Sequence, residues 1–417
     1  MDNTALHLFK QKALQYANTF DVCCCLDSNH YSDPHSQYDC LMAFGVEQEL
    51  KENSGNAFTR LKSFYEERKD WLFGLFSYEL KNEIEAIKSN HKDELDFPDL
   101  YFFIPQFLIA LKGSDLTVIK GNPKIIEKIN EIELSLPVLP KLNIQHRFDQ
   151  KTYVETVEKL QAHIKRGDIY EVNFCQEFFA KHADIDPASL YQALNEVSPT
   201  PFAGFFKIYD KYILSATPER FLCKRDNILI SQPIKGTAKR SKDLIVDEQI
   251  KLNLKNSIKE QAENVMIVDL VRNDLTKSAV SGSVKVDELF GIYTFPQVHQ
   301  MISTISCKLD PNIHFIDAIK NTFPIGSMTG APKVKAMELI DSYEKSKRGV
   351  FSGSFGCISP NGDFDFNVVI RTILYNASNK YLSFQVGGAI TYAASAEDEY
   401  EECLLKASAI MKVLGKV

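Results

Sequence analysis

Helical spacing of apolar residues is clearest in the segment 150–166, which lies between an aspartate and a glycine. Asp149 can accept a hydrogen bond from a free amide of the first turn, and Gly167 can adopt the left-handed conformation that ends many helices. The apolar residues recur every three or four positions, as one face of a helix requires; they are Val154, Val157, Leu160 and Ile164. The pattern predicts one amphipathic helix here.

Two further segments alternate with a period of two, which indicates strands. In "DIYEVNFC" the alternation puts Val172 and Phe174 on one face and Glu171 on the other, beside apolar neighbours. In "DFDFNVVIRTILY" it places Arg371 on the face of Val369 and Ile373 in a single predicted strand. A guanidinium on a largely apolar face requires a carboxylate partner, so Arg371 is a candidate anion-binding residue.

Two predicted helices carry acidic residues three positions apart, which places each pair on one helix face. Glu260 and Glu263 lie in "KEQAENVMIVDLVRND", and Glu399 and Glu402 follow Ser395, the first residue of an S-x-x-D capping motif. Such pairs are usually solvated or interact with the helix dipole. Two helices that present acids to one cleft would, however, supply carboxylate ligands for magnesium.

Glycine-rich turns mark two places where backbone can approach a ligand closely. In "FPIGSMTGAPK" two glycines enclose Ser327 to Thr329 before another predicted helix, and a helix N-terminus with free amides binds anions readily. The segment lacks the Walker A pattern, so nucleotide binding is a weak hypothesis. "VGGAI", with Gly387 and Gly388, is the second such place.

Composition narrows the function classes. The 417 residues carry a net charge of -7, so no basic field is available for nucleic acid or an anionic membrane. The most apolar run, "YFFIPQFLIAL", contains a proline and is shorter than the roughly 20 residues of a membrane span. The first residues show no secretory signal, and we expect a cytoplasmic protein. No fixed-period repeat is present, and Pro137 and Pro140 mark a seam between two patterned regions.

The nine cysteines are an odd number and form no disulfide framework, which fits a reducing compartment. Cys23 to Cys25 could be grouped with His30, His35 and Cys40 as a metal cluster, but the spacing matches no zinc pattern. We interpret these cysteines as buried structural thiols.

A lysine in "SQPIKGTAKR" lies between an apolar pair and a glycine. For a lone lysine, a solvated side chain in a turn is the ordinary interpretation. Lys235 becomes a candidate catalytic residue only when it is considered together with the other motifs of the chain.

The order of eight motifs resembles the chorismate-utilising enzyme family. They are "GDIYEVNFCQEF", "SATPERF", "PIKGT", "AENVMIVDLVRNDL", "GSMTGAPKVKAMELID", "RGVFSGSFGCIS", "DFNVVIRTI" and "AEDEYEECLLKA". The resemblance is dense over 145–417, the expected catalytic region. In 1–144 only "WLFGLFSYELKNEIE" is similar, so this region is expected to be divergent and to contribute to the β core. The family implies an α+β fold, with two large, mostly antiparallel sheets in a sandwich-like core flanked by helices and an active site in the cleft between them.

The resemblance also implies a binding site for chorismate and magnesium. Glu263 and Glu402 resemble the magnesium ligands, with Glu260 and Glu399 in or just behind the coordination shell. The substrate carboxylates would contact Arg371 and the backbone of two turns. The further substrate-binding candidates are Gly236, Thr237, Ser327, Met328, Thr329, Gly387, Gly388 and Glu171.

Two residues resemble catalytic residues of the family. Glu219, in "TPERF", matches a general acid that protonates the departing C4 hydroxyl, and partial burial should raise its pKa. Lys235 matches the lysine of members that form aminodeoxychorismate, where the amine attacks C2 as the C4 hydroxyl leaves, and ammonia then adds at C4 and expels the lysine from C2. Free lysine has a pKa of about 10.4. Desolvation, and repulsion from Lys239 and Arg240 if they lie close, are expected to depress it.

The resemblance leaves other functions open. Anthranilate-forming members resemble P-I-A-G-T at the lysine position, so Lys235 argues against them. Isochorismate-forming members have a lysine where this chain has Glu171, and amine-using members commonly have glutamine there. A homologue that binds chorismate without turnover, and a feedback-sensing or scaffold role for the first 145 residues, are further alternatives.

Further departures concern residues that would contact the substrate. Gln300 stands where the family usually has histidine, with His299 on the opposite face of a strand, and Cys357 replaces a tyrosine. Because no G-x-C-x-G amidotransferase motif is present, we expect ammonia to come from solution or from a separate glutamine amidotransferase subunit.

Overall fold

The computed structural model describes residues 3–85, 87, 89, 91–134, 139–296 and 298–415. Its helices are α1 (Asn3–Asn18), α2 (Ala57–Arg68), α3 (Lys81–Ile84), α4 (Ile125–Asn130), α5 (Gln150–Arg166), α6 (Pro187–Val197), α7 (Leu244–Asn256), α8 (Ile258–Thr276), α9 (Phe315–Thr322), α10 (Lys333–Tyr343) and α11 (Ala396–Val413). Short 3-10 helices are η1 (Tyr78–Leu80) and η2 (Gly326–Met328). In this part of the chain, no helix is both long and apolar enough to cross a membrane.

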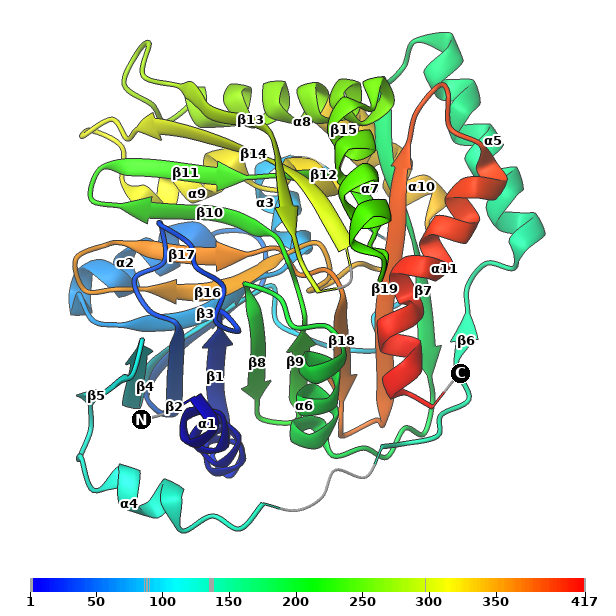
Figure 1. The fold of residues 1–417 in the computed structure, drawn as a ribbon. Helices are drawn as coiled ribbons and strands as arrows, with labels where there is room; N and C mark the ends of the chain where they lie inside the picture. Colours follow the sequence, from blue (N-terminus) through cyan, green and yellow to red (C-terminus); the bar gives the residue numbers. More distant parts are fainter. Residues whose placement is uncertain are drawn as a thin grey trace.

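The strands form two antiparallel groups, which we call the first and the second wing, and both groups pair with the long strand β4 (Leu100–Lys112) (Figure 1). The first wing runs in space from β7 (Glu171–Ala180) through β19 (Tyr381–Ile390), β18 (Thr372–Asn376), β9 (Lys211–Ser215), β8 (Ala203–Ile208), β1 (Val22–Asp27) and β2 (Cys40–Glu52) to β4. Its margins also carry β5 (Asp115–Lys120), β6 (Gln145–His146) and β15 (Gly330–Ala331).

The second wing begins beside β4 with β3 (Leu72–Phe76). It continues through β16 (Ser354–Ile358), β17 (Phe364–Asn367), β10 (Arg220–Arg225) and β11 (Ile228–Gln232) to β14 (Val298–Lys308), which also pairs with β12 (Ile234–Lys239) and β13 (Lys285–Thr294). The predicted large antiparallel sheets with flanking helices are confirmed. Strands from the first 112 residues contribute to both wings.

Helices cover each wing on a different side of the molecule. α11 packs on β19 and contacts α5 and α6, whereas α8 packs on β12 and β14 and contacts α9 (Figure 1). The predicted caps are confirmed: the Asp149 side chain accepts from the Thr152 amide, Gly167 is left-handed, and Ser395 accepts from the Asp398 amide. α5 and α11 therefore begin at the residues that the sequence predicts.

Two local predictions are wrong. The segment around Arg371 is not a single strand, because the chain bends between β17 and β18 and Arg371 takes a φ of 51°. The segment around Lys235, for which a turn is the ordinary interpretation, is instead the strand β12, where Gly236 has a φ of 97° and forms a bulge at which the pairing with β14 changes register. Of the predicted seam, Pro137 lies outside the described residues, whereas Pro140 lies within them in a segment without regular structure.

All nine cysteines are buried and free, as the sequence predicts. Burial raises the pKa of the Cys23 thiol to about 12. These thiols therefore remain protonated near neutral pH and fill the core as apolar side chains.

Candidate active site

One pocket of about 160 Å³ lies between the β19 and α11 side of the first wing and the β12 and α8 side of the second. Residues far apart in the sequence meet there. Of the predicted site residues, it is lined by Glu219, Lys235, Gly236, Thr237, Glu260, Glu263, Ser327, Met328, Arg371, Gly387, Gly388, Glu399 and Glu402. Thr329 and Glu171 do not line it.

Lys235 points its amine at a carboxylate rather than at other cations. Its Nζ lies 2.5 Å from Oε1 of Glu171, and both side chains are buried. Burial lowers the pKa of Lys235, but the charges of Glu171, Glu263 and Glu219 outweigh burial and raise it above the ordinary value. The expected depression by Lys239 and Arg240 is therefore wrong.

Arg240 does not face the amine because another carboxylate binds it. Its guanidinium pairs with Asp247 at 2.8 Å, and the same aspartate accepts from His299. His299 and Gln300 lie on opposite faces of β14, as predicted, and only Gln300 lines the pocket.

Glu219, the predicted general acid, is buried and lines the pocket. Burial raises the pKa of Glu219 to about 7, even though the hydrogen bond from Ser327 Oγ to its Oε1, at 2.7 Å, lowers it. The raised pKa expected for this residue is present. A protonated fraction of Glu219 therefore persists at neutral pH.

Four glutamates line the pocket from two helices: Glu260 and Glu263 from α8, and Glu399 and Glu402 from α11. Burial raises the pKa of Glu263 to about 7, and burial together with the nearby Glu402 raises the pKa of Glu399 to about 7. The pKa of Glu260 is also raised by burial, whereas Lys406 lowers that of Glu402. The Glu402 carboxylate lies 2.7 Å from Lys406 Nζ.

The donor set suits a hard divalent cation, because carboxylate oxygens are the ligands that magnesium prefers. In the part of the chain that the structure describes, no three acidic, histidine or cysteine side chains are close enough together to hold a metal without rearrangement. The raised pKa values of Glu260, Glu263 and Glu399 indicate carboxylates that lack sufficient counter-charge. The residues thus offer carboxylate oxygens that suit a divalent cation, and magnesium stays a prediction.

The crowded carboxylates should make the metal-free protein less stable at higher pH. Since the folded pKa of Glu263 lies near 7 and its unfolded value near 4.5, the folded state binds more protons between these values, and stability falls as pH rises through this window. Glu263→Gln should therefore raise the Tm in chelator by roughly 1 to 3 °C at pH 8 and hardly at all at pH 4.5. Differential scanning calorimetry at both pH values measures the difference, and an equal Tm at pH 8 would contradict the electrostatic account.

Arg371 presents a guanidinium to the pocket without an ion-pair partner among the described residues. Burial lowers the pKa of Arg371, and the charge of Glu219 opposes this. The predicted carboxylate partner is therefore absent from the described part of the chain. A cation held in this way favours an anionic ligand.

Two glycine segments line the pocket with backbone. Gly387 and Gly388 belong to β19, and a side chain at Gly388 would meet the Glu399 carboxylate at 2.6 Å. Met328 and Ser327 line the pocket from η2. The Thr329 hydroxyl instead donates to Gly326 O, so Thr329 stabilises the loop and does not line the pocket.

The sequence did not single out several residues that support this site. Asn173 donates from Nδ2 to Ser327 O at 2.9 Å, which fixes the loop that carries the partner of Glu219. Lys259 and Lys406 line the pocket, each four residues from a site glutamate. The spacing of four residues on a helix predicts these ion pairs from the sequence, whereas the Asn173 contact depends on tertiary structure.

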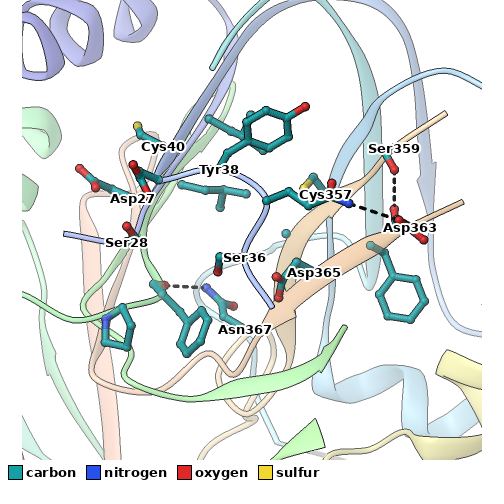
Figure 2. A pocket seen from close by; sticks show the side chains of 18 of the residues that line it. Asp27, Ser28, Ser36, Tyr38, Cys40, Cys357, Ser359, Asp363, Asp365 and Asn367 are labelled. Carbon is teal, nitrogen blue, oxygen red and sulfur yellow. Dashed lines mark hydrogen bonds between the residues drawn. The ribbon is translucent and has the colours of Figure 1, made fainter. Parts of the chain in front are cut away.

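A second pocket lies apart from this group, between β1, β2 and β16 (Figure 2). Figure 2 shows Ser28 and Cys40 on one side and Cys357 and Asp363 on the other. Cys357 lines this second pocket and not the one that contains Lys235. The expectation that Cys357 replaces a substrate contact is therefore wrong.

Comparison with known proteins identifies relatives over most of the chain. Residues 22–412 match the model of a family described as chorismate binding enzyme. Aminodeoxychorismate synthase component 1 of Escherichia coli (strain K12) is 35% identical over 349 residues, covering 82% of this chain and 76% of that protein. The protein of the same name from Salmonella typhimurium is 41% identical over 262 residues, covering 63% and 57%.

A solved structure shares the fold over nearly the full length of both chains. The crystal structure of anthranilate synthase component I from Streptococcus pneumoniae TIGR4 superposes with a TM-score of 0.78 and 25% identity, covering 91% of this chain and 92% of that one. Similarity of fold thus extends to a protein that is named for a different activity.

Proposed function

The chain belongs to the family of chorismate binding enzymes, and from that premise we propose that it is an aminodeoxychorismate synthase component 1. It would convert chorismate and ammonia to 4-amino-4-deoxychorismate, the precursor of 4-aminobenzoate in folate biosynthesis. The observation that carries the proposal is Lys235, whose side chain lines the pocket together with Glu219 and Arg371. The names of the relatives support the same activity.

The pocket offers separate contacts for the two carboxylates of chorismate. Arg371 supplies a guanidinium without an ion pair among the described residues, and Gly387, Gly388 and Met328 line the same pocket. Magnesium would be held by Glu263 and Glu402, with Glu260 and Glu399 close by, and would neutralise the ring carboxylate when bound. A chorismate bound by these residues would present C2 to Lys235.

The metal requirement gives a test with its own readout. Glu402→Gln removes one carboxylate, so the magnesium concentration for half-maximal activity should rise about tenfold or more, in line with the loss of one charged ligand. The Tm increase that magnesium and chorismate give the wild type should shrink in parallel. Unchanged values of both quantities would remove Glu402 from the metal site.

Lys235 is the proposed nucleophile. After it loses a proton, its Nζ forms a bond to C2, the two ring double bonds shift, and the C4–oxygen bond breaks. Glu219 gives its proton to the departing hydroxyl, which leaves as water. Ammonia then bonds to C4, the double bonds shift back, and the electron pair of the C2–N bond returns to Lys235.

The nitrogen source is proposed to be a separate glutamine amidotransferase subunit, which fits the "component 1" in the names of the relatives. Glutamine should support product formation only when a cognate amidotransferase is added, whereas ammonium chloride should support it alone. Co-elution of the two proteins and glutamine-dependent turnover measure this. Failure of every cognate amidotransferase to bind or to restore glutamine use would contradict a partner.

Anthranilate synthase component I is the second candidate, and the fold shared with the Streptococcus pneumoniae protein favours it. In that reaction no lysine nucleophile is needed. The position of Lys235 in the pocket therefore favours aminodeoxychorismate.

A further inference from the structure

The carboxylate that holds Lys235 lies outside the substrate pocket. Lys235 lines the pocket, but Glu171, 2.5 Å from Nζ, does not. The Glu171 side chain is only 6% exposed, and in the described part of the chain Lys235 Nζ is its one hydrogen-bond donor. Glu171 thus contacts the amine of Lys235 without itself lining the pocket.

Backbone pairing on both edges of β7 fixes Glu171. Ala331 lies opposite Glu171 in β15, and Val172 lies opposite Ile390 in β19. Just beyond the residue on either side, the Tyr170 amide donates to Ala331 O at 2.7 Å and the Asn173 amide to Thr329 O at 2.8 Å. Glu171 can therefore serve as a rigid anchor for a flexible side chain.

Lys235 needs such an anchor because other acids compete for its amine. The Lys235 side chain is a flexible four-carbon stem, and the carboxylates of Glu219 and Glu263 also attract its positive charge. Glu260 and Glu402 add to the negative field around the lysine. Only Glu171 makes an ion pair with Nζ in the described part of the chain. Without it, the amine would turn toward the glutamates proposed to bind metal or to supply the proton.

We propose that Glu171 is a positioning residue, which accepts a hydrogen bond from Nζ and aims Lys235 at C2 of the substrate without touching the substrate itself. This inference rests on the proposed function and replaces the earlier expectation that Glu171 binds substrate. The proposed role requires only an oxygen at this point of β7 that accepts a hydrogen bond from Lys235 Nζ. An amide oxygen can also supply this acceptor.

The test compares three variants by the rate of covalent adduct formation, followed by intact-mass spectrometry after rapid quenching, and by steady-state product formation. Glu171→Ala removes the acceptor, so adduct formation and kcat should fall about 100-fold, the usual cost of a misplaced reacting group. KM for chorismate should change less than about twofold, because no substrate contact is lost. Glu397→Ala, an exposed acid at the start of α11, is the control and should behave as the wild type.

Glu171→Gln distinguishes position from other roles. Its amide oxygen can accept the same hydrogen bond, so adduct formation should recover to within about fivefold of the wild type, with an unchanged Tm. The proposal is overturned by a Glu171→Ala variant as fast as the wild type, by a raised chorismate KM in that variant, or by a Glu171→Gln variant as slow as Glu171→Ala.

The outcome for the wild type separates this inference from the proposed function. If the wild type forms neither adduct nor aminodeoxychorismate, the proposed function fails. If the wild type forms both and Glu171→Ala does so equally fast, only the positioning role fails.

Discussion

Lys235→Ala is expected to abolish the covalent adduct and to reduce aminodeoxychorismate formation at least about 10³-fold, because the variant lacks the amine that forms the bond to C2. The pocket should still bind chorismate, since Arg371 and the glycine backbone that line it are unchanged. Intact-mass spectrometry of quenched enzyme and chromatography of the product measure both effects.

Lys239→Ala is the matched control for this experiment. Lys239 belongs to the same strand, β12, but its side chain is exposed and does not line the catalytic pocket. It should retain the adduct and the rate of the wild type. An adduct that persists in Lys235→Ala would assign the nucleophile to another residue.

Glu219→Gln is expected to lower kcat about 10²- to 10⁴-fold, because the amide cannot give a proton to the departing hydroxyl. Ser327 can still hydrogen bond to the amide oxygen, so the loop that lines the pocket should keep its position. A fall in kcat with little change in the chorismate KM would identify a group that acts on the reacting atoms.

The pH profile gives an independent readout for the same residue. As pH rises, the deprotonated fraction of Lys235 increases, while protonated Glu219, with a pKa of about 7, decreases above that value. The two changes cancel above pH 7, so log kcat/KM of the wild type should rise to a plateau near pH 7. In Glu219→Gln it should continue to rise toward the pKa of Lys235. An identical break near pH 7 in both proteins would assign it to another group.

Sequence patterns predicted the local elements where a short-range physical cause determines them. The helix from Gln150 to Arg166 follows from its apolar spacing and from the caps at Asp149 and Gly167. The prediction of a single strand around Arg371 is wrong because alternation cannot reveal that the chain bends and that Arg371 adopts a left-handed conformation. Tertiary contacts override the pattern at such a position.

The residues of the site could be listed from the sequence only through the resemblance to a family. Glu219, Glu263 and Glu399 lie far apart in the chain, and no periodicity predicts that they line one pocket. The partner of Lys235 was also unreadable: Arg240 is near in sequence, yet Asp247 binds it, whereas Glu171 is distant in sequence and contacts the amine. Side-chain pairing between elements decided the sign of the Lys235 pKa shift.

The most direct test of the proposed function is chromatographic identification of the product that the purified protein forms from chorismate, magnesium and ammonium chloride. We predict aminodeoxychorismate, which an added lyase converts to 4-aminobenzoate. Anthranilate as the product would contradict it, and would mean that Lys235 does not determine which amination this pocket performs.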